Sequence, residues 1–298
     1  MNQVKPLLSI VKEGPVFIPG IYDCLSSRIM EVNNFQAMYL DIESVAASFC
    51  GVPDPEMLTS ADLLEVVNRI TAYAELPMIV DIHNGFGDIL NLMRACGQLT
   101  SFGTAGICIN DQTYGNHFVK TDVVSHGEFA KRIQAVREAS GNKECFLLFR
   151  TDACALGIDE VIARCRFALE NGADAVCAGY PEKAEDIERI AKEVPGIKFH
   201  IMKSGANLPD ISYDELIKMG YQGVIAPSVS IGGAITCIQE LSDALAADKN
   251  DFRAEERGYS TISKFELLRV HEWYSLGKQF NENILDTAAI NPNDYLKK

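Results

Sequence analysis

The sequence has little positive charge for its length. Of its 298 residues, 27 are Lys or Arg and 41 are Asp or Glu, so the formal net charge is −14. A surplus of negative charge disfavours non-specific binding to nucleic acid or to an anionic membrane, because both partners are themselves negatively charged. We therefore expect neither as a partner. A small anionic substrate is still allowed, since the local field of a pocket can oppose the net charge.

Long hydrophobic runs and paired cysteines are also missing. No apolar run approaches the roughly 18 residues of a membrane span, and the N-terminus is too short and polar for a signal peptide. The nine cysteines are irregularly spaced, without a Cys-x-x-Cys pair, and several, such as Cys108, lie in apolar runs. This usage is typical of reduced thiols, and we expect a soluble cytoplasmic protein.

Short apolar runs alternate along the chain with longer amphipathic stretches. The runs predict eight strands, at Val16–Ile18, Ala37–Asp41, Met78–Asp81, Gly106–Ile109, Cys145–Arg150, Ala175–Cys177, Lys198–Met202 and Gly223–Ala226. The stretches between and after them predict eight helices, at Leu25–Asn33, Ala61–Ala74, Ile89–Thr100, His126–Ser140, Ile158–Asn171, Ala184–Glu193, Ser212–Met219 and Ile231–Leu245.

Strict alternation of strands and helices predicts parallel strands joined by crossover helices. Eight such units favour a closed (β/α)8 barrel of the TIM type over an open sheet. No Pro/Ser-rich linker divides the chain. We predict a barrel over residues 1–250, with a short N-terminal helix covering its base. Residues 251–298, with a helix over Ser263–Leu276, would be an extension of the same domain.

In such a barrel the active site lies at the C-terminal ends of the strands. Asp41 and Glu43 follow the second strand, Asp81 and His83 the third, and Arg150 ends the fifth. Carboxylates that converge from neighbouring strands need a positive partner, and a divalent cation is the usual one. A buried Arg needs an anion, and its fork suits a carboxylate or phosphonate. This pattern indicates a metal and a small anionic substrate.

Several motifs occur in the order found in one enzyme family. They are Pro19–Arg28, Val45–Ser48, Gly51–Asp54, Asp81–Gly87, Arg150–Ala153, Gly157–Glu160 and Gly172–Ala175. Together the sequence resembles the isocitrate lyase/phosphoenolpyruvate mutase superfamily from about residue 5 to residue 280. The resemblance implies a (β/α)8 barrel whose C-terminal helices are swapped between the subunits of a homodimer, usually within a homotetramer.

The resemblance also implies a chemistry. Members of the family bind Mg²⁺ and a small 2-oxo or hydroxy acid, and break or rearrange a C–C or P–C bond, or decarboxylate, through a metal-held enolate. It assigns Asp81 as the direct metal ligand and Asp54 as an acidic residue near the metal. His83 and Asn110 stand where the family has carboxylates. A direct His ligand would favour Mn²⁺ or another divalent ion over Mg²⁺.

Other positions depart from the family pattern. Asp41 and Ile42 replace the small Ser-Gly pair that holds the anionic group of the substrate. The gating loop has no Cys, so isocitrate lyase chemistry by that mechanism is not expected; Asn116 and His117 occupy it instead. We predict Arg150 and Tyr22 as substrate-binding residues. Asp41 is a second candidate for substrate binding. The candidate catalytic residues are Arg150, Asn116, His117, Asp41 and Glu43.

Two further hypotheses remain open at this point. A lysine near a strand end, Lys203, could form a Schiff base if its environment lowered its pKa. Alternatively, the loss of family carboxylates could mark a non-catalytic binding or scaffold protein. Against the scaffold, converging Asp41, Glu43 and Asp81 with no ion between them would destabilise the barrel.

Overall fold

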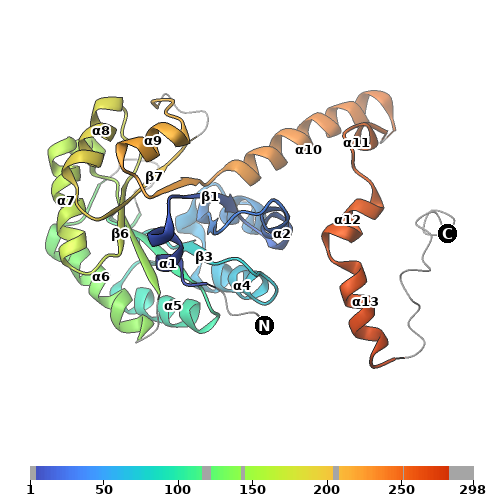
Figure 1. Cartoon of the computed structure of the whole chain (residues 1–298), viewed down its shortest axis with the longest axis horizontal. Coiled ribbons are helices and arrows are strands. Elements are labelled where there is room, and N and C mark those ends of the chain that lie inside the picture. Colours follow the sequence, from blue (N-terminus) through green and yellow to red (C-terminus); the bar gives the residue numbers. More distant parts are fainter. Residues whose placement is uncertain (1–4, 116–121, 142–144, 204–207, 251, 282–298) are drawn as a thin grey trace. The chain divides into compact units, whose positions relative to one another are not determined.

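The structure is a computed structural model that describes residues 5–115, 122–141, 145–203, 208–250 and 252–281. Eight parallel strands form a closed barrel in chain order, and β8 pairs with β1 to close it (Figure 1). The strands are β1 (Val16–Ile21), β2 (Met38–Leu40), β3 (Met78–Asp81), β4 (Gly106–Asn110), β5 (Phe146–Thr151), β6 (Ala175–Ala178), β7 (Ile197–Ile201) and β8 (Gly223–Ala226). The predicted (β/α)8 barrel and all eight strands are confirmed.

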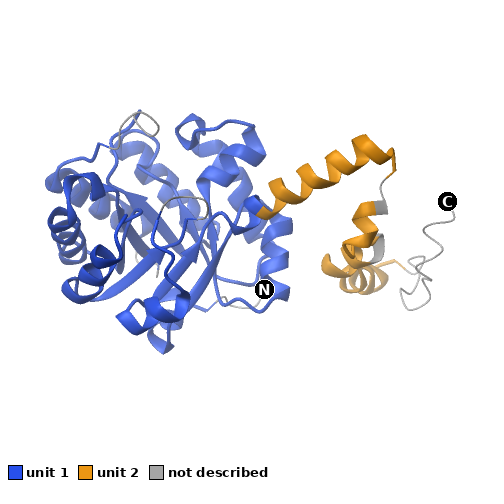
Figure 2. Cartoon of the chain, turned by 90° about the horizontal axis from the view of Figure 1, so that it is seen from above, with its two compact units in different colours: residues 1–232 blue, residues 233–298 orange. Residues whose placement is uncertain are grey.

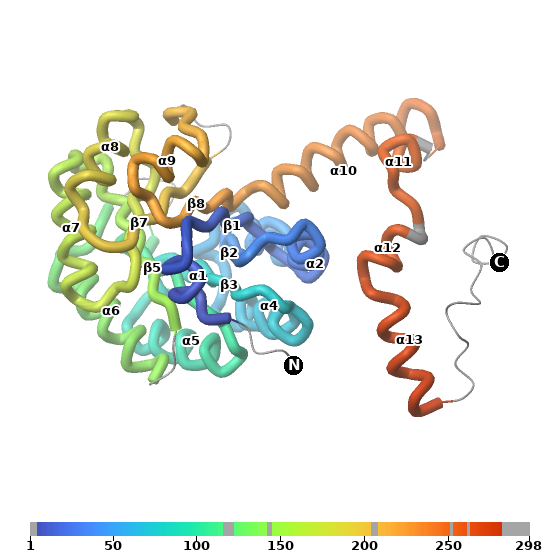
Figure 3. The backbone as a smooth tube through the Cα atoms, viewed as in Figure 1, coloured from blue at the N-terminus to red at the C-terminus, as the bar shows by residue number. Residues whose placement is uncertain are grey.

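Helices α2 to α9 connect successive strands, as the tube in Figure 3 shows, while α1 precedes β1 and α10 to α13 follow β8. The helices are α1 (Leu7–Glu13), α2 (Cys24–Val32), α3 (Ile42–Val45), α4 (Ser60–Thr71), α5 (Ile89–Ser101), α6 (His126–Ser140), α7 (Ile158–Glu170), α8 (Ala184–Glu193), α9 (Tyr213–Met219), α10 (Val229–Asp248), α11 (Phe252–Glu256), α12 (Thr261–Leu267) and α13 (Val270–Lys278). Each helix predicted in the barrel is present, with ends shifted by a few residues at most. No described helix is long and apolar enough to cross a membrane.

Local sequence signals explain where these helices begin. The side chains of Asp23, Thr59 and Ser212 accept hydrogen bonds from backbone N–H groups of the first turns of α2, α4 and α9. Such N-caps satisfy donors that have no partner inside the helix. In the loops at the C-terminal end of the barrel, four short helical segments were not predicted. They are α3, η1 (Ala46–Cys50), η2 (Pro55–Met57) and η3 (Ala153–Leu156).

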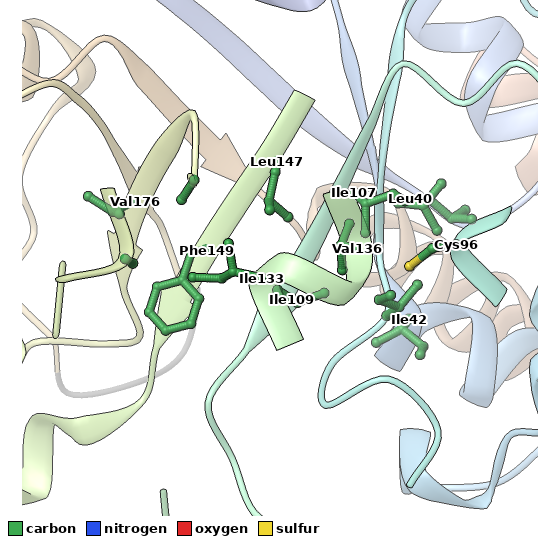
Figure 4. Close-up of a cluster of buried hydrophobic side chains, with 14 of the residues drawn as sticks. Leu40, Ile42, Cys96, Ile107, Ile109, Ile133, Val136, Leu147, Phe149 and Val176 are labelled. Atoms are coloured by element: carbon green, nitrogen blue, oxygen red, sulfur yellow. The ribbon is translucent and has the colours of Figure 1, made fainter. Parts of the chain in front are cut away.

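Two hydrophobic clusters fill the barrel and its surroundings. One lies inside the barrel and includes Ile18, Tyr39 and Phe199, and α1 contributes Leu7 to it. The predicted helix at the base is therefore confirmed. The other lies between strands and helices (Figure 4). Alternate residues of each strand serve the two clusters because successive side chains of a strand point to opposite faces.

The chain divides into two compact units, residues 1–232 and 233–298 (Figure 2). The division falls inside α10, whereas the sequence placed the end of the barrel at residue 250. Helix α10 has no buried residue. The helical stretch predicted over Ser263–Leu276 is present as two helices, α12 and α13. Arg269 separates them with a φ of 57°, a left-handed conformation that interrupts a helix.

Candidate active site

Asp81 ends β3 and lies at the centre of the polar residues, with only 2% of its surface exposed. Its Oδ2 accepts a hydrogen bond from the Tyr39 hydroxyl at 2.7 Å, and its Oδ1 accepts one from the His83 N–H at 2.9 Å. Burial would raise the pKa of Asp81, but His83, Arg150 and these hydrogen bonds lower it below its ordinary value. The side chain is therefore a buried carboxylate that stays ionised.

Arg150 reaches Asp81 from β5. Its Nη1 lies 3.3 Å from Asp81 Oδ2, while its Nε and Nη2 lie 3.2 and 3.1 Å from Asp152 Oδ2. Burial would lower the pKa of Arg150, yet the charges of Asp152 and Asp81 raise it well above its ordinary value. The guanidinium is thus a fixed cation between two carboxylates, as the prediction of an inward Arg with an anionic partner requires.

A second set of buried charges braces this pair. Asp111 Oδ1 accepts the Asp152 N–H at 2.9 Å, and its Oδ2 accepts hydrogen bonds from Thr151 Oγ1 at 2.7 Å and Arg164 Nη1 at 3.0 Å. Gln112 Nε2 donates to Asp152 Oδ2 at 2.9 Å. These bonds leave Asp152 little freedom to rotate, so the orientation of Arg150 is set by residues that follow β4 and β5.

Asp41 follows β2 and caps α3. Its Oδ2 accepts hydrogen bonds from the backbone N–H of Ser44, at 3.1 Å, and from the Ser44 hydroxyl. Burial raises the pKa of Asp41 to about 7; the charges of Glu43 and Asp81 add to the rise, and the Ser44 hydrogen bonds oppose it. Asp41 follows β2 and Asp81 ends β3, so both residues lie at the C-terminal end of the barrel.

The four predicted metal-binding residues are only partly brought together. His83 Nε2 lies 3.8 Å from Asp81 Oδ2, and the Asn110 N–H donates to the His83 carbonyl at 2.9 Å. Asn110 Oδ1 accepts the backbone N–H of Gln112, whereas Asp54 is half-buried and caps η2 through a bond from the Glu56 N–H. Across the residues that the structure describes, no three His, Cys, Asp or Glu side chains form a metal-binding group.

The remaining candidates from the sequence that the structure describes do not join the group of buried charges around Asp81. Tyr22 is half-buried and packs against the hydrophobic cluster outside the barrel. Asn116 and His117 lie outside the described residues. Lys203 is exposed, with its Nζ 4.2 Å from the centre of the Tyr180 ring. A Schiff-base lysine acts from an enclosed, desolvated pocket, and an exposed Lys203 lacks such a pocket, so the structure does not support that hypothesis.

Three side chains of the candidate site were missed or given too little weight in the sequence. Tyr39 donates to Asp81, Asp152 holds Arg150, and Tyr180 covers the inner cluster where β6 ends. The alternation within β2 could have revealed Tyr39, because Tyr39 and Asp41 are two residues apart and share a face. No local signal marks Tyr180, whose inward direction depends on a φ of 56°.

The geometry can be compared with known proteins. The sequence model described as phosphoenolpyruvate phosphomutase matches residues 7–246. The chain belongs to this family. It is 32% identical over 253 residues to 2,3-dimethylmalate lyase of Eubacterium barkeri, which covers 84% of this chain and 86% of that protein. It is 31% identical over 277 residues to the petal death protein of Dianthus caryophyllus, covering 91% and 87%.

A solved structure of oxaloacetate acetylhydrolase in complex with the product oxalate superposes with a TM-score of 0.87. The match covers 93% of this chain and 97% of that one, and at 23% identity it shows the fold. Since named relatives are lyases and a mutase, the chain is an enzyme of the lyase or mutase type within the phosphoenolpyruvate mutase/isocitrate lyase superfamily. The scaffold hypothesis is therefore wrong.

Proposed function

We propose that this protein is a carbon–carbon lyase that cleaves a small 2-hydroxy dicarboxylate of the alkylmalate type. One observation carries the proposal. The fixed Arg150 cation lies at the same end of the barrel as Asp41, whose carboxyl has a pKa of about 7. The pair supplies a carboxylate-binding group and a base that is active near neutral pH. The similarity to a dimethylmalate lyase supports the choice of substrate.

Arg150 would hold one carboxylate of the substrate. A guanidinium has five N–H donors. In Arg150, one N–H of Nη1 points to Asp81, and the Nε N–H and one N–H of Nη2 point to Asp152. One N–H on Nη1 and one on Nη2 remain, which is the arrangement that grips a carboxylate with two parallel hydrogen bonds. Because Asp152 already fixes the side chain, little conformational entropy is lost when the substrate binds.

Asp41 would act as the base. In its ionised form it takes the proton of the 2-hydroxyl group, so that the C–O bond becomes a carbonyl as the adjacent C–C bond breaks. A carboxylate with an ordinary pKa would be a weak base at neutral pH, and burial corrects this by raising the pKa of Asp41 to about 7. The hydrogen bonds from Ser44 keep the carboxylate in place.

A divalent cation fits the donor chemistry at Asp81. Mg²⁺ is commonly held by one or two carboxylates, with water and substrate oxygens completing its shell, so a group of three protein ligands is not required. Asp81 would be the carboxylate, with His83 and Asn110 beside it and Asp54 farther out on η2. When bound, such a cation would supply positive charge that stabilises the negative charge developing during bond cleavage.

The test is a turnover assay followed by proton and phosphorus NMR. The protein is mixed with Mg²⁺ or Mn²⁺ and with 2,3-dimethylmalate, 2-methylmalate, oxaloacetate or phosphonopyruvate. We expect an alkylmalate to yield pyruvate and a second acid. Asp81→Asn should lower this turnover at least about a hundredfold and remove the binding of Mn²⁺ seen by calorimetry.

Asp88→Asn is the matched control, because Asp88 is an exposed helix cap and Asn caps a helix equally well. It should keep wild-type turnover. If the protein turns over only phosphonopyruvate, the proposed carbon–carbon cleavage is wrong and the reaction is phosphorus–carbon cleavage at the same residues. If it turns over only oxaloacetate, the reaction is decarboxylation at the same residues. Turnover that survives in Asp81→Asn would contradict the proposed role of Asp81.

We also propose that the chain forms a homodimer or homotetramer. Helix α10 has no buried residue and exposes Val229, Ile235, Ile238 and Leu245. Exposed apolar surface of this kind favours association with a second copy. Light scattering should give two or four times the mass of 32.8 kDa. A monomer at micromolar concentration would contradict the proposal.

A further inference from the structure

Cleavage of an alkylmalate needs a proton donor as well as a base, and this inference rests on the proposed function. When the C2–C3 bond breaks, its electron pair passes to C3 and the neighbouring carboxylate, and C3 must then receive a proton. Asp41 is not suited to donate this proton to C3, because it acts as the base that takes the hydroxyl proton. Tyr39 uses its proton to bind Asp81, and the guanidinium of Arg150 does not release one.

Tyr180 is held over the interior of the barrel in a costly backbone conformation. It follows β6 and has a φ of 56°, which few residues other than Gly adopt. Its ring packs against the cluster inside the barrel, although it comes from the loop beyond the strand. A left-handed non-Gly residue at the active end of a barrel is the kind of strain that a functional constraint maintains.

Gly179, the residue before Tyr180, lies close against Asp152. A Cβ atom on Gly179 would lie 1.8 Å from Asp152 Oδ1 and 3.4 Å from the Thr151 carbonyl oxygen. The absence of a side chain therefore lets Asp152 occupy the space beside β6 and hold Arg150.

The hydroxyl of Tyr180 lies within the electrostatic field of the candidate site. Burial raises the pKa of Tyr180, Arg150 opposes the rise, and the carboxylates Glu43, Asp152 and Asp41 add to it. The phenol is thus protonated at rest. Lys203 Nζ lies 4.2 Å from the ring centre, where a cation stabilises negative charge on the ring.

Tyr180 also lines a cavity of about 300 Å³, together with Lys203 and His200. Burial lowers the pKa of His200 to about 4, so the imidazole is neutral at physiological pH and adds no charge. A cavity of this size holds several water molecules, which can return a proton to the phenolate.

We propose that Tyr180 is the general acid of the reaction and delivers its hydroxyl proton to C3. Asp41 removes the proton of the 2-hydroxyl, the C2–C3 bond breaks, and the electron pair is captured at C3 by the proton of Tyr180. The products are pyruvate, or a substituted 2-oxo acid, and the acid derived from C3. The phenolate then takes a proton from water in the cavity, and Asp41 releases one.

The test compares Tyr180→Phe with wild type in the presence of Mg²⁺. General acid catalysis is worth about 10²–10⁴ in rate, so we expect kcat to fall at least about a hundredfold. KM should change less than about threefold, because Phe preserves the ring that faces the substrate. Oxalate, used as a probe of the Arg150 end, should bind to both proteins with similar affinity in calorimetry.

A second measurement separates acid catalysis from packing. In D₂O, wild type should exchange the α-proton of the product acid by running the protonation step in reverse, whereas Tyr180→Phe should not. Tyr73→Phe removes a hydroxyl from a residue that is 68% exposed at the end of α4, and should behave as wild type in both assays. Lys203→Met should lower kcat about tenfold, and Lys192→Met, at an exposed position of α8, should not.

The outcomes distinguish the two proposals. If wild type cleaves alkylmalates and Tyr180→Phe keeps its rate within about threefold, Tyr180 is not the acid and the proposed function stands. If Tyr180→Phe loses oxalate binding together with turnover, its role is in packing, which also overturns the inference. If wild type neither binds oxalate nor cleaves any substrate in the series, both the proposed function and the inference fail.

Discussion

The two halves of the barrel's C-terminal end differ in how their polar groups are held. Along β3, β4 and β5, buried carboxylates and arginines are joined by hydrogen bonds and ion pairs, from Asp81 through Arg150 and Asp152 to Asp111. After β6 and β7, a tyrosine, an exposed lysine and a neutral histidine surround a cavity of about 300 Å³. The first half is fixed before substrate arrives, and the second has room for solvent.

This difference teaches how one fold can separate two tasks. Electrostatic stabilisation works best with groups that need no reorganisation, and a buried network of charges meets that condition. Proton donation requires a group that can lose and regain a proton, so it needs access to water. Substitutions in the charged half should therefore cost stability as well as activity, whereas those in the open half should cost activity alone.

The largest expected effect follows from Arg150→Ala. Removing the cation leaves Asp81 and Asp152 buried without their shared partner, and breaking a buried ion pair costs about 3–5 kcal/mol. Urea denaturation should show this loss, and oxalate binding should disappear. Arg164→Ala, which removes a partner of Asp111, should destabilise the protein but retain measurable oxalate binding. Equal binding losses in both variants would contradict the separate role of Arg150.

The second largest effect is a pH-dependent change in the free energy of unfolding that is caused by Asp41. Its pKa is raised to about 7 in the folded protein from 3.8, so the folded state binds more protons than the unfolded state between these values. The contribution of Asp41 to the free energy of unfolding is therefore largest below about pH 4, and it is lost as the pH rises through about 7. Asp41→Asn should remove this loss, a difference on the order of 4 kcal/mol at pH 8.

Unfolding measured by urea at pH 5 and pH 8 checks this prediction. Asn keeps the helix cap, so the comparison with wild type isolates the ionisation of Asp41. Activity should move in the opposite direction: wild-type kcat/KM rises with pH through about 7 as the base forms, and Asp41→Asn is inactive. A stability difference that does not change between the two pH values would contradict the raised pKa.

The smallest effect is expected for Gly179→Ala, at the border between the two halves. The new Cβ would overlap Asp152, whose Oδ2 is already bound by Arg150 and Gln112. Overpacking of this kind costs about 1–3 kcal/mol, and the disturbed Arg150 should weaken oxalate binding. Gly127→Ala, where a Cβ meets no neighbouring atom, should not destabilise the protein in the same thermal unfolding experiment.

Much of the fold could be predicted because local patterns determine it. Apolar runs such as Met78–Asp81 became strands within a few residues, and alternation with amphipathic stretches implied the parallel barrel. The convergence of Asp81 and Arg150 followed from topology alone, since all parallel strands of a barrel end at the same edge. The break at Arg269 was not predicted, because no local residue signal marks a left-handed Arg.

The sequence by itself determined the barrel, the charged strand ends and the family, because periodicity, strand count and motif order are written along the chain. Only the tertiary structure decided that Tyr39 binds Asp81, that Asp152 orients Arg150 and that Tyr180 faces the inside of the barrel. These pairings join residues from different strands, and they depend on the stagger of the closed barrel and on the backbone angles of single residues.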